Sequence, residues 1–260
     1  MANPAIPETD FKLITTEGYQ FKVLSELLNN NLVEANFVFD QDGIHLREAN
    51  EKETVLIDIR IYAENLQYEP PAETMFVGFT CQHLYKMLRR IKKKDKLVIY
   101  KLKGSDELSF NILNADKDRD KDASIRIKDV KHSEWDMPEY PRIPVTAIPA
   151  SEYQRMTKEM STASKQITAK VQKSGVMFLG GTPQLYAISD KYGSWADDGE
   201  VTCSKTFDSK QLASLSKCSG LATNNYLKLF SNGEENPLKI TSCIGSIGVA
   251  QFCVDVEKTV

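Results

Sequence analysis

The order of helices and strands predicted for the first half of the chain recurs in the second half, and this repeat limits the possible folds most. Phe21, in the first predicted helix, precedes Gly43 by 22 residues, and Tyr153 precedes Gly175 by the same 22. Glycine suits a turn at both places because it adopts positive φ at little cost. Hydrophobic spacing places the matching elements at 11–15, 16–29, 35–39 and 43–47, and at 143–147, 150–161, 166–171 and 176–179. The repeat predicts two similar α+β domains.

The segment 129–144 separates the two halves and differs from both in composition. Prolines at 138, 141 and 144 exclude a helix or a central strand, so we expect this linker to run extended. Trp135, Met137 and Tyr140 are large apolar side chains that an exposed spacer gains little by carrying. They either pin the linker to a domain or form a surface groove, and the flanking prolines favour a groove.

Residues 84–93 separate into an apolar and a cationic stripe when they are placed on a helix. One face of such a helix can pack on a core while the other attracts a polyanion. Both stripes recur at i, i+3, i+4 and i+7, with Leu84, Met87, Leu88 and Ile91 on one side and Lys86, Arg89, Arg90 and Lys93 on the other.

The chain as a whole is slightly acidic, with 33 Lys and Arg against 36 Asp and Glu and a formal net charge of -3. A nucleic-acid-binding domain is usually basic overall, so the cationic face must be a local arrangement. The five cysteines lack C-x-x-C pairing, which argues against a disulfide framework or a zinc site and favours a reducing compartment. Without a signal-peptide pattern or an apolar run of roughly 18 residues, we expect an intracellular protein with no membrane association.

No pattern predicts catalysis, a metal site or a cofactor. His45, His83 and His132 fall in different predicted elements, and neither common glycine-rich phosphate loop is present. Acidic and basic residues alternate over 116–122, which favours a solvated hairpin tip over a calcium loop. The basic run 89–96 resembles a nuclear-import signal, but a cationic helix end explains it more simply.

The chain resembles the DNA sliding clamps of the proliferating cell nuclear antigen (PCNA) family. The resemblance extends from Phe11 to about Val256 and depends on the order and spacing of several short motifs. These motifs are Tyr19-Gln20-Phe21-Lys22-Val23-Leu24, Asp42-Gly43-Ile44-His45-Leu46, Lys86-Met87-Leu88-Arg89, Met137-Pro138-Glu139, Ile148-Pro149-Ala150-Ser151-Glu152-Tyr153-Gln154-Arg155 and Pro237-Leu238-Lys239-Ile240.

The resemblance implies a pseudo-six-fold ring of three subunits, in which four helices per subunit line the hole and the sheets form the outer wall. Cations lining the hole attract duplex DNA, and contacts limited to phosphates carry no sequence information and permit sliding. The implied divisions are an N-terminal extension at 1–10, clamp domain 1 at 11–128, an interdomain linker at 129–144 and clamp domain 2 at 145–258.

The DNA-facing residues are predicted on all four helices. A solvated charged face is the simpler reading of any one helix, but four helices with the same bias favour DNA. Glu26, Glu152 and Glu159 interrupt that bias. The residues assigned to DNA are Lys22, Lys86, Arg89, Arg90, Lys93, Arg155, Lys158, Lys210 and Lys217.

Two further surfaces are expected, one for self-assembly and one for partner peptides. Segments 123–128 and 184–189 read as sheet edges, and pairing of two different edges closes a ring when the rotation is right. The expected subunit contacts are Ala123, Ile125, Ile127, Leu185, Ala187 and Ile188. The groove that the family implies for partner peptides comprises Ala49, Thr54, Leu56, Trp135, Met137, Pro138, Tyr140, Phe252, Val254 and Val256.

The predicted function is that of a non-enzymatic processivity factor. It encircles double-stranded DNA without sequence specificity, assembles as a homotrimer, and tethers DNA polymerase, a clamp loader and other proteins bearing clamp-binding peptides. The alternatives are a checkpoint-type clamp subunit, a monomeric viral processivity factor and, more remotely, an α+β enzyme that binds a phosphorylated substrate. Trp135 and the segment 255–257 depart from the family pattern. The expected location is therefore the nucleus or the replication compartment of a large DNA virus.

Overall fold

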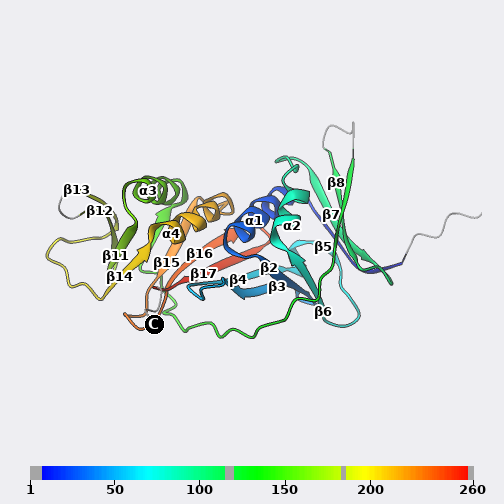
Figure 1. Ribbon diagram of the computed structural model, residues 1–260, viewed down its shortest axis with the longest axis horizontal. Coiled ribbons are helices and arrows are strands. Elements are labelled where there is room, and N and C mark those ends of the chain that lie inside the picture. Colours follow the sequence, from blue (N-terminus) through cyan, green and yellow to red (C-terminus); the bar gives the residue numbers. More distant parts are fainter. Residues whose placement is uncertain (1–7, 115–119, 183–185, 257–260) are drawn as a thin grey trace, which may run out of the picture.

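The computed structural model describes residues 8–114, 120–182 and 186–256, and within them the chain forms four α-helices and seventeen strands. The strands make three sheets of five, eight and four strands. All four helices lie in a row along one side of the molecule (Figure 1). The α+β fold class predicted from the sequence is confirmed.

The five-stranded sheet comes entirely from the first half of the chain. Its order is β5-β1-β7-β8-β9, so β9 is an edge strand. The strands are β1 (Thr9–Thr15), β5 (Gln67–Glu69), β7 (Lys96–Leu102), β8 (Glu107–Leu113) and β9 (Lys121–Arg126).

The eight-stranded sheet joins the two halves of the chain through β17 and β4. These strands pair antiparallel along their length, from Gly248 opposite Ile61 to Val254 opposite Val55. The order is β10-β15-β16-β17-β4-β3-β2-β6. The strands are β2 (Glu34–Phe39), β3 (Gly43–Ala49), β4 (Val55–Tyr62), β6 (Met75–Thr80), β10 (Thr146–Pro149), β15 (Tyr226–Phe230), β16 (Leu238–Ile244) and β17 (Gly248–Val254).

The four-stranded sheet comes from the second half and has the order β13-β12-β11-β14, with β13 at an edge. In Figure 1 it lies at the opposite end of the molecule from the five-stranded sheet. The strands are β11 (Gln166–Gln172), β12 (Gly175–Thr182), β13 (Tyr186–Gly193) and β14 (Cys203–Asp208).

The helices cover the sheets with apolar faces at helical spacing. Phe21, Leu24 and Leu28 of the first helix and Tyr153 and Met156 of the third are buried in one continuous core. The helices are α1 (Gly18–Asn31), α2 (Cys81–Leu88), α3 (Ala150–Ala163) and α4 (Ser209–Ser214), with 3₁₀ turns η1 (Ala63–Asn65) and η2 (Leu215–Gly220).

The two repeat glycines serve different purposes. Gly43 has a φ of 135°, and a Cβ there would lie 2.0 Å from the Ile61 carbonyl oxygen, so both conformation and space require glycine. Gly175 does not have a positive φ, which corrects the sequence expectation. Its Cβ would instead lie 2.8 Å from the Trp195 backbone nitrogen, so the need there is for space.

The segment between β9 and β10 contains neither helix nor strand, apart from one bridge between Lys128 and Gly78. The Asn36 side chain anchors its start by donating from Nδ2 to the Val130 carbonyl oxygen at 3.0 Å. In Figure 1 this linker passes below the eight-stranded sheet, on the side away from the helices. It therefore covers one face of that sheet while the helices cover the other.

Candidate nucleic-acid interface, partner groove and sheet edges

The cationic segment after β6 is less helical than its spacing predicts. Helix α2 ends at Leu88, Arg89 is its C-cap, and Lys93 lies in a following turn. The sequence prediction of one helix over 84–93 is therefore wrong, because Asp95 ties back the turn by accepting from the Lys92 backbone nitrogen at 2.9 Å. Ile91 is nonetheless fully buried, whereas Met87 is only half-buried.

The cations of this segment remain at the surface. Lys86, Arg89, Arg90 and Lys93 are all exposed, and the Lys93 ammonium lies 5.9 Å from the centroid of the Tyr19 ring. An exposed Lys or Arg is available to an external anion at little desolvation cost. The segment therefore forms a concentrated positive surface at the first-half end of the helical row.

Two predicted cations, one on α1 and one beside it, have contacts within the chain. Lys22 donates from Nζ to the Ile91 carbonyl oxygen at 3.3 Å, and its ammonium is 5.3 Å from the Tyr19 ring centroid. Lys217, on η2, pairs with Glu26 of α1 at 2.8 Å. This ion pair connects helical elements of the two halves. Because Glu26 neutralises Lys217, one of the cations that the sequence assigns to DNA is already paired within the chain.

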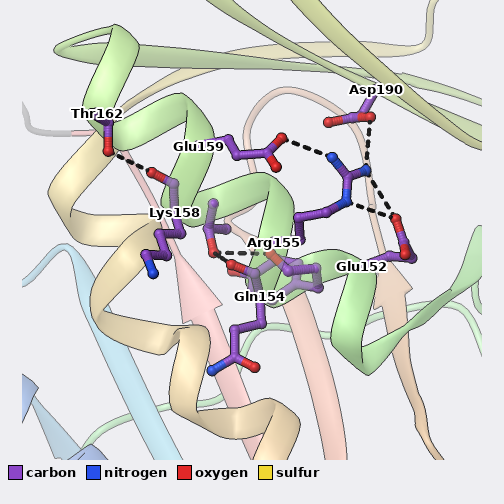
Figure 2. A network of polar contacts seen from close by, with 9 residues as sticks. Glu152, Gln154, Arg155, Lys158, Glu159, Thr162 and Asp190 are labelled. Atoms are coloured by element: carbon purple, nitrogen blue, oxygen red, sulfur yellow. Dashed lines mark hydrogen bonds and ion pairs between the residues drawn. The ribbon is translucent and has the colours of Figure 1, made fainter.

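Arg155 on α3 is surrounded by three carboxylates. Its Nη2 lies 2.9 Å from Glu152 Oε2 and 3.4 Å from Asp190 Oδ1, and its Nη1 lies 2.7 Å from Glu159 Oε2. Figure 2 shows the three acids converging on the guanidinium, while Lys158 points away from the cluster. Hydrogen bonding and charge from Glu152, followed by the charge of Glu159, raise the pKa of Arg155.

The positive charge on the helical face is therefore uneven. Glu152 and Glu159 balance Arg155 and Lys158 on α3, and Asp190 adds a further negative charge. Lys158 and Lys210 are exposed, and Lys210 lies in the first turn of α4, whose N-cap Asp208 accepts from its backbone nitrogen at 2.8 Å. A phosphate backbone lying along this face meets the strongest attraction at α2 and the turn after it.

The linker is fastened to the eight-stranded sheet by a buried aspartate. Asp58 on β4 has a side chain that is 4% exposed, and its Oδ1 accepts from Arg47 Nε at 2.8 Å. Arg47 Nη1 donates to the Trp135 carbonyl oxygen at 3.0 Å. Gln251 donates to the other Asp58 oxygen at 3.1 Å. The sequence reading missed Arg47 and Asp58, although an aspartate in the segment 55–61, which is apolar except for Asp58 and Arg60, signals a paired buried charge.

A second attachment lies at the other end of the linker. The Tyr140 hydroxyl donates to the Pro237 carbonyl oxygen at 2.8 Å, and the Lys239 ammonium lies 4.2 Å from the Tyr140 ring centroid. Burial, together with the adjacent Cys253 thiol, raises the pKa of Tyr140. Burial also lowers the pKa of Lys239. Trp135, Met137, Pro138 and Tyr140 are all half-buried, and the buried indole nitrogen of Trp135 has no partner among the described residues.

The sheet face beneath the linker differs from the predicted groove. Phe252 and Val254 are 0% exposed and belong to the core under the helices, so they are not available to a partner. Thr54 is also buried. Because side chains alternate along a strand, Gln251 and Cys253 of β17 face the linker, and Cys253 is itself buried at 2% exposure. Register places Ala49, Leu56, Cys253 and Lys239 in one row across neighbouring strands.

A groove of about 1440 Å³ lies beside this surface, and no linker residue lines it. Of the predicted groove residues, it is lined by Thr54 and Val256. The segment around Val256 is held by Asp255, which pairs with the nearly buried Lys205 at 2.8 Å. Gln211 donates to the carbonyl oxygens of Thr54 and Asp255, both at 2.9 Å.

The two predicted assembly segments lie on or beside strands β9 and β13, and each of these strands is at the edge of its sheet. Ile125 is buried, and Ala123, Ile127 and Ile188 are half-buried against the core. Ala187 is exposed. The predicted contact residue Leu185 lies outside the described residues.

Within the described ranges, no group of three His, Cys, Asp or Glu side chains is placed to hold a metal ion. No helix in that part of the chain is both long enough and apolar enough to cross a membrane.

Removing the buried carboxylate of Asp58 should destabilise the fold and weaken the attachment of the linker. We expect Asp58→Ala to lower the free energy of unfolding by about 2 to 3 kcal/mol, because Arg47 loses its partner and Gln251 loses an acceptor. The exposed Asp42→Ala is the control. Urea unfolding measures both variants, and an equal small effect would contradict a structural role for the Asp58 pair.

Comparison with known proteins identifies the fold and its family. The family model of the PCNA N-terminal domain matches residues 11–135, and that of the PCNA C-terminal domain matches 137–256. A crystal structure of PCNA from Entamoeba histolytica superposes with a TM-score of 0.82 at 18% identity, covering 95% of this chain and 99% of that one.

Proteins with similar sequences are also PCNA proteins or sliding clamps. Proliferating cell nuclear antigen 2 of Plasmodium falciparum is 20% identical over 82% of this chain and 84% of its own length. PCNA of Chaetomium thermophilum is 21% identical over 89% of this chain and 92% of its own. DNA polymerase sliding clamp 1 of Pyrobaculum aerophilum is 32% identical over 31% of this chain and 32% of its own.

Two matched clamp domains with four helices in one row define a sliding clamp, the class of protein that acts as a processivity factor. The chain belongs to the PCNA family, as predicted from its motifs. Members of this family are non-enzymatic scaffolds that form rings and act with DNA and polymerases.

Proposed function

We propose that three copies of this chain close into a ring around double-stranded DNA and slide along it as a non-enzymatic tether for DNA polymerase. The observation that carries this proposal is the helical row, which presents exposed Lys86, Arg89 and Arg90 on one side of the molecule while unpaired strand edges lie at its two ends. Phosphate contacts from such a surface hold DNA without reading its sequence.

Each proposed segment of the chain has its own role in the ring. Residues 11–128 and 145–258 act as two clamp domains joined by the linker 129–144, with an extension at 1–10. The nucleus is the proposed location, with the replication compartment of a large DNA virus as the alternative. A clamp loader opening the ring and partners carrying clamp-binding peptides complete the proposal.

The mass in solution tests the ring directly. A homotrimer has three times the 29.3 kDa of one chain, about 88 kDa, and light scattering should find it. A monomer would favour the monomeric processivity factor, and a chain that assembles only with different subunits would favour a checkpoint-type clamp. Sliding is then tested by loading the ring on nicked circular DNA and linearising the DNA, which should release it. Retention on the linear ends would contradict topological binding.

We further propose that a partner peptide docks where the linker passes the half-buried Ala49 and Leu56, which are in register with the buried Cys253. Support comes from the half-buried linker side chains Trp135 and Met137 and from the buried, unpartnered indole nitrogen of Trp135. The linker is held at this face by Arg47, which lies on the same strand as Ala49 and donates to the Trp135 carbonyl oxygen. Extended segments with apolar pockets for a few anchors are a common mode of peptide recognition.

Shortening one linker side chain should weaken this binding. We expect Met137→Ala to reduce the affinity for a polymerase-derived peptide by about 1 to 3 kcal/mol, because alanine is too short to pack against an anchor side chain of the peptide. Met177→Ala, a half-buried methionine on β12, is the matched control. Calorimetric titration measures both, and equal affinities for wild type and a Trp135→Ala/Met137→Ala double variant would place the partner site elsewhere.

A further inference from the structure

Strand β14 forms an edge of the four-stranded sheet that the proposed ring does not use. The order β13-β12-β11-β14 places it opposite β13, the edge assigned to assembly. Ser209, directly after β14, donates from its backbone nitrogen to the Lys165 carbonyl oxygen at 2.9 Å, in the register of the two strands. Bonded and non-bonded pairs alternate in an antiparallel ladder, so odd-numbered residues of β14 bond β11. The backbone groups of Ser204 and Thr206 therefore point away from the sheet.

These outward backbone groups lack partners. In the described part of the chain, no hydrogen bond reaches the N–H or the C=O of Ser204 or Thr206, and both residues are exposed. The Thr206 hydroxyl shares a hydrogen bond with that of Thr168 on β11 at 2.8 Å, so this side chain is turned toward its own sheet. An open edge of this kind is a template on which an extended chain can add as a further strand.

The first half of the chain shows the equivalent edge already covered. Strand β6 is also an edge, and it leads into α2 as β14 leads into α4. Cys81 and Ser209, the first residues of these helices, each donate back to the residue before the neighbouring strand at 2.9 Å. Gly78 lies three residues before α2, as Thr206 lies three residues before α4. Lys128, at the start of the linker, donates to the Gly78 carbonyl oxygen at 2.9 Å in an antiparallel bridge.

The groove of about 1440 Å³ provides room for such a segment at β14. It is lined by Thr206 together with Asn50 and Val256. Small-molecule sites usually measure roughly 300 to 1,000 Å³, so a length of chain suits this groove better. None of the described residues that line it is aromatic, which leaves a single-stranded nucleic acid no ring for base stacking. A phosphodiester also has no donor for the outward carbonyl oxygens, whereas a peptide has one at each residue.

The charge of the groove selects an acidic chain. Lys165, Lys170 and Lys210 line it, and none of the three has an ion pair within the described residues. Asp208 is the one acidic residue among the described lining residues, and its carboxylate already accepts from the Lys210 backbone nitrogen at 2.8 Å. Lys52 also lines the groove, beside two exposed glutamates of its own loop. Positive charge is therefore in excess along β11 and the start of α4.

We infer that an acidic, extended segment of a partner protein adds to β14 as a fifth strand of this sheet. Backbone hydrogen bonds to Ser204 and Thr206 hold the segment, and Lys165 and Lys170 favour carboxylates on it. The inference goes beyond the proposed function, since β14 lies at the opposite edge of the sheet from β13 and the linker does not line the groove. It requires neither a closed ring nor bound DNA.

A short acidic peptide tests this addition. The probe is a fluorescent peptide of alternating aspartate and valine, about eight residues long, which is within the usual length of a strand. We expect fluorescence polarisation to show binding to the wild-type chain, and binding about tenfold weaker for a peptide with lysine in place of aspartate. Two further probes carry N-methyl groups on every second residue, in opposite phases. One phase should lose binding and the other retain it, because only one edge of an added strand bonds its neighbour.

Variants of the chain locate the contact. Thr206→Pro removes an outward N–H and should weaken binding of the acidic peptide by about tenfold, whereas Thr206→Ala retains the N–H and should bind as the wild type does. A thermal melt checks that both variants fold. Lys165→Gln/Lys170→Gln should weaken binding and make it less sensitive to salt. Lys131→Gln/Lys173→Gln removes the same charge at exposed positions outside the groove and is the matched control.

Three outcomes would overturn the inference. Equal binding of the two N-methylated probes would show that the peptide does not add to the sheet. Binding only by a chain shortened to end at Val256 would assign the edge to residues 257–260 of the same chain. Displacement of the peptide by an oligothymidylate would assign the groove to nucleic acid. None of these outcomes bears on the ring, whose mass in solution is measured separately.

Discussion

Replacing Lys86, Arg89 and Arg90 with Glu will strip the ring of stable retention on circular DNA while leaving its assembly intact. The three side chains are exposed and have no ion-pair partner described in the structure, so their reversal costs the fold little. They also form the densest cationic part of the helical face, since α3 carries as many acids as bases. The slope of log affinity against log salt should become shallower by about 0.9 for each phosphate that is no longer neutralised.

The control for this variant is an equal reversal elsewhere. Lys131, Lys173 and Lys228 are exposed, and they lie on the linker, on a turn and on the strand face away from the helices. Reversing all three changes the net charge by the same amount, so any general effect of charge appears in both variants. Equal loss of DNA retention in the two triple variants would show that α2 has no special role. An unchanged salt slope in the α2 variant would show that its cations do not contact phosphate.

The uneven charge of the helical face shows where sequence reasoning was sufficient and where it was not. The apolar spacing of Tyr153, Met156 and Met160 correctly predicted which side of α3 is buried. Glu152 and Glu159 could be seen at i−3 and i+4 from Arg155. Asp190 could not, because it comes from a strand whose position depends on the packing of the whole four-stranded sheet.

Long-range strand pairing explains the other corrections. The alternation in β17 is compatible with either face, and only its pairing with β4 sends Phe252 into the core and turns Cys253 toward the linker. Nothing local in the sequence indicates that the last strand pairs with one from the first half. The early end of α2 at Leu88 has a local cause in Asp95, but a residue seven positions on is difficult to identify as the cause without coordinates.

Proline at either assembly edge will convert the ring to monomers. Ser124→Pro removes an outward N–H from β9, and Ser189→Pro removes one from β13, whereas the bonds of each strand to its own sheet are made by neighbouring residues. The exposed positions of both serines should let the fold survive, which a thermal melt checks. Ser124→Ala and Ser189→Ala retain the N–H groups and should remain trimeric.

Mixing the two proline variants makes a sharper test, because the proposed contact joins two different edges. The Ser124→Pro chain keeps an intact β13, and the Ser189→Pro chain keeps an intact β9. Each variant alone lacks one half of every contact and should be a monomer. Together they can make one contact and no more, so light scattering should find a dimer of twice 29.3 kDa, about 59 kDa. A dimer formed by Ser124→Pro alone would mean that like edges pair with like, and a contact of that kind closes as a twofold dimer and cannot build a three-membered ring.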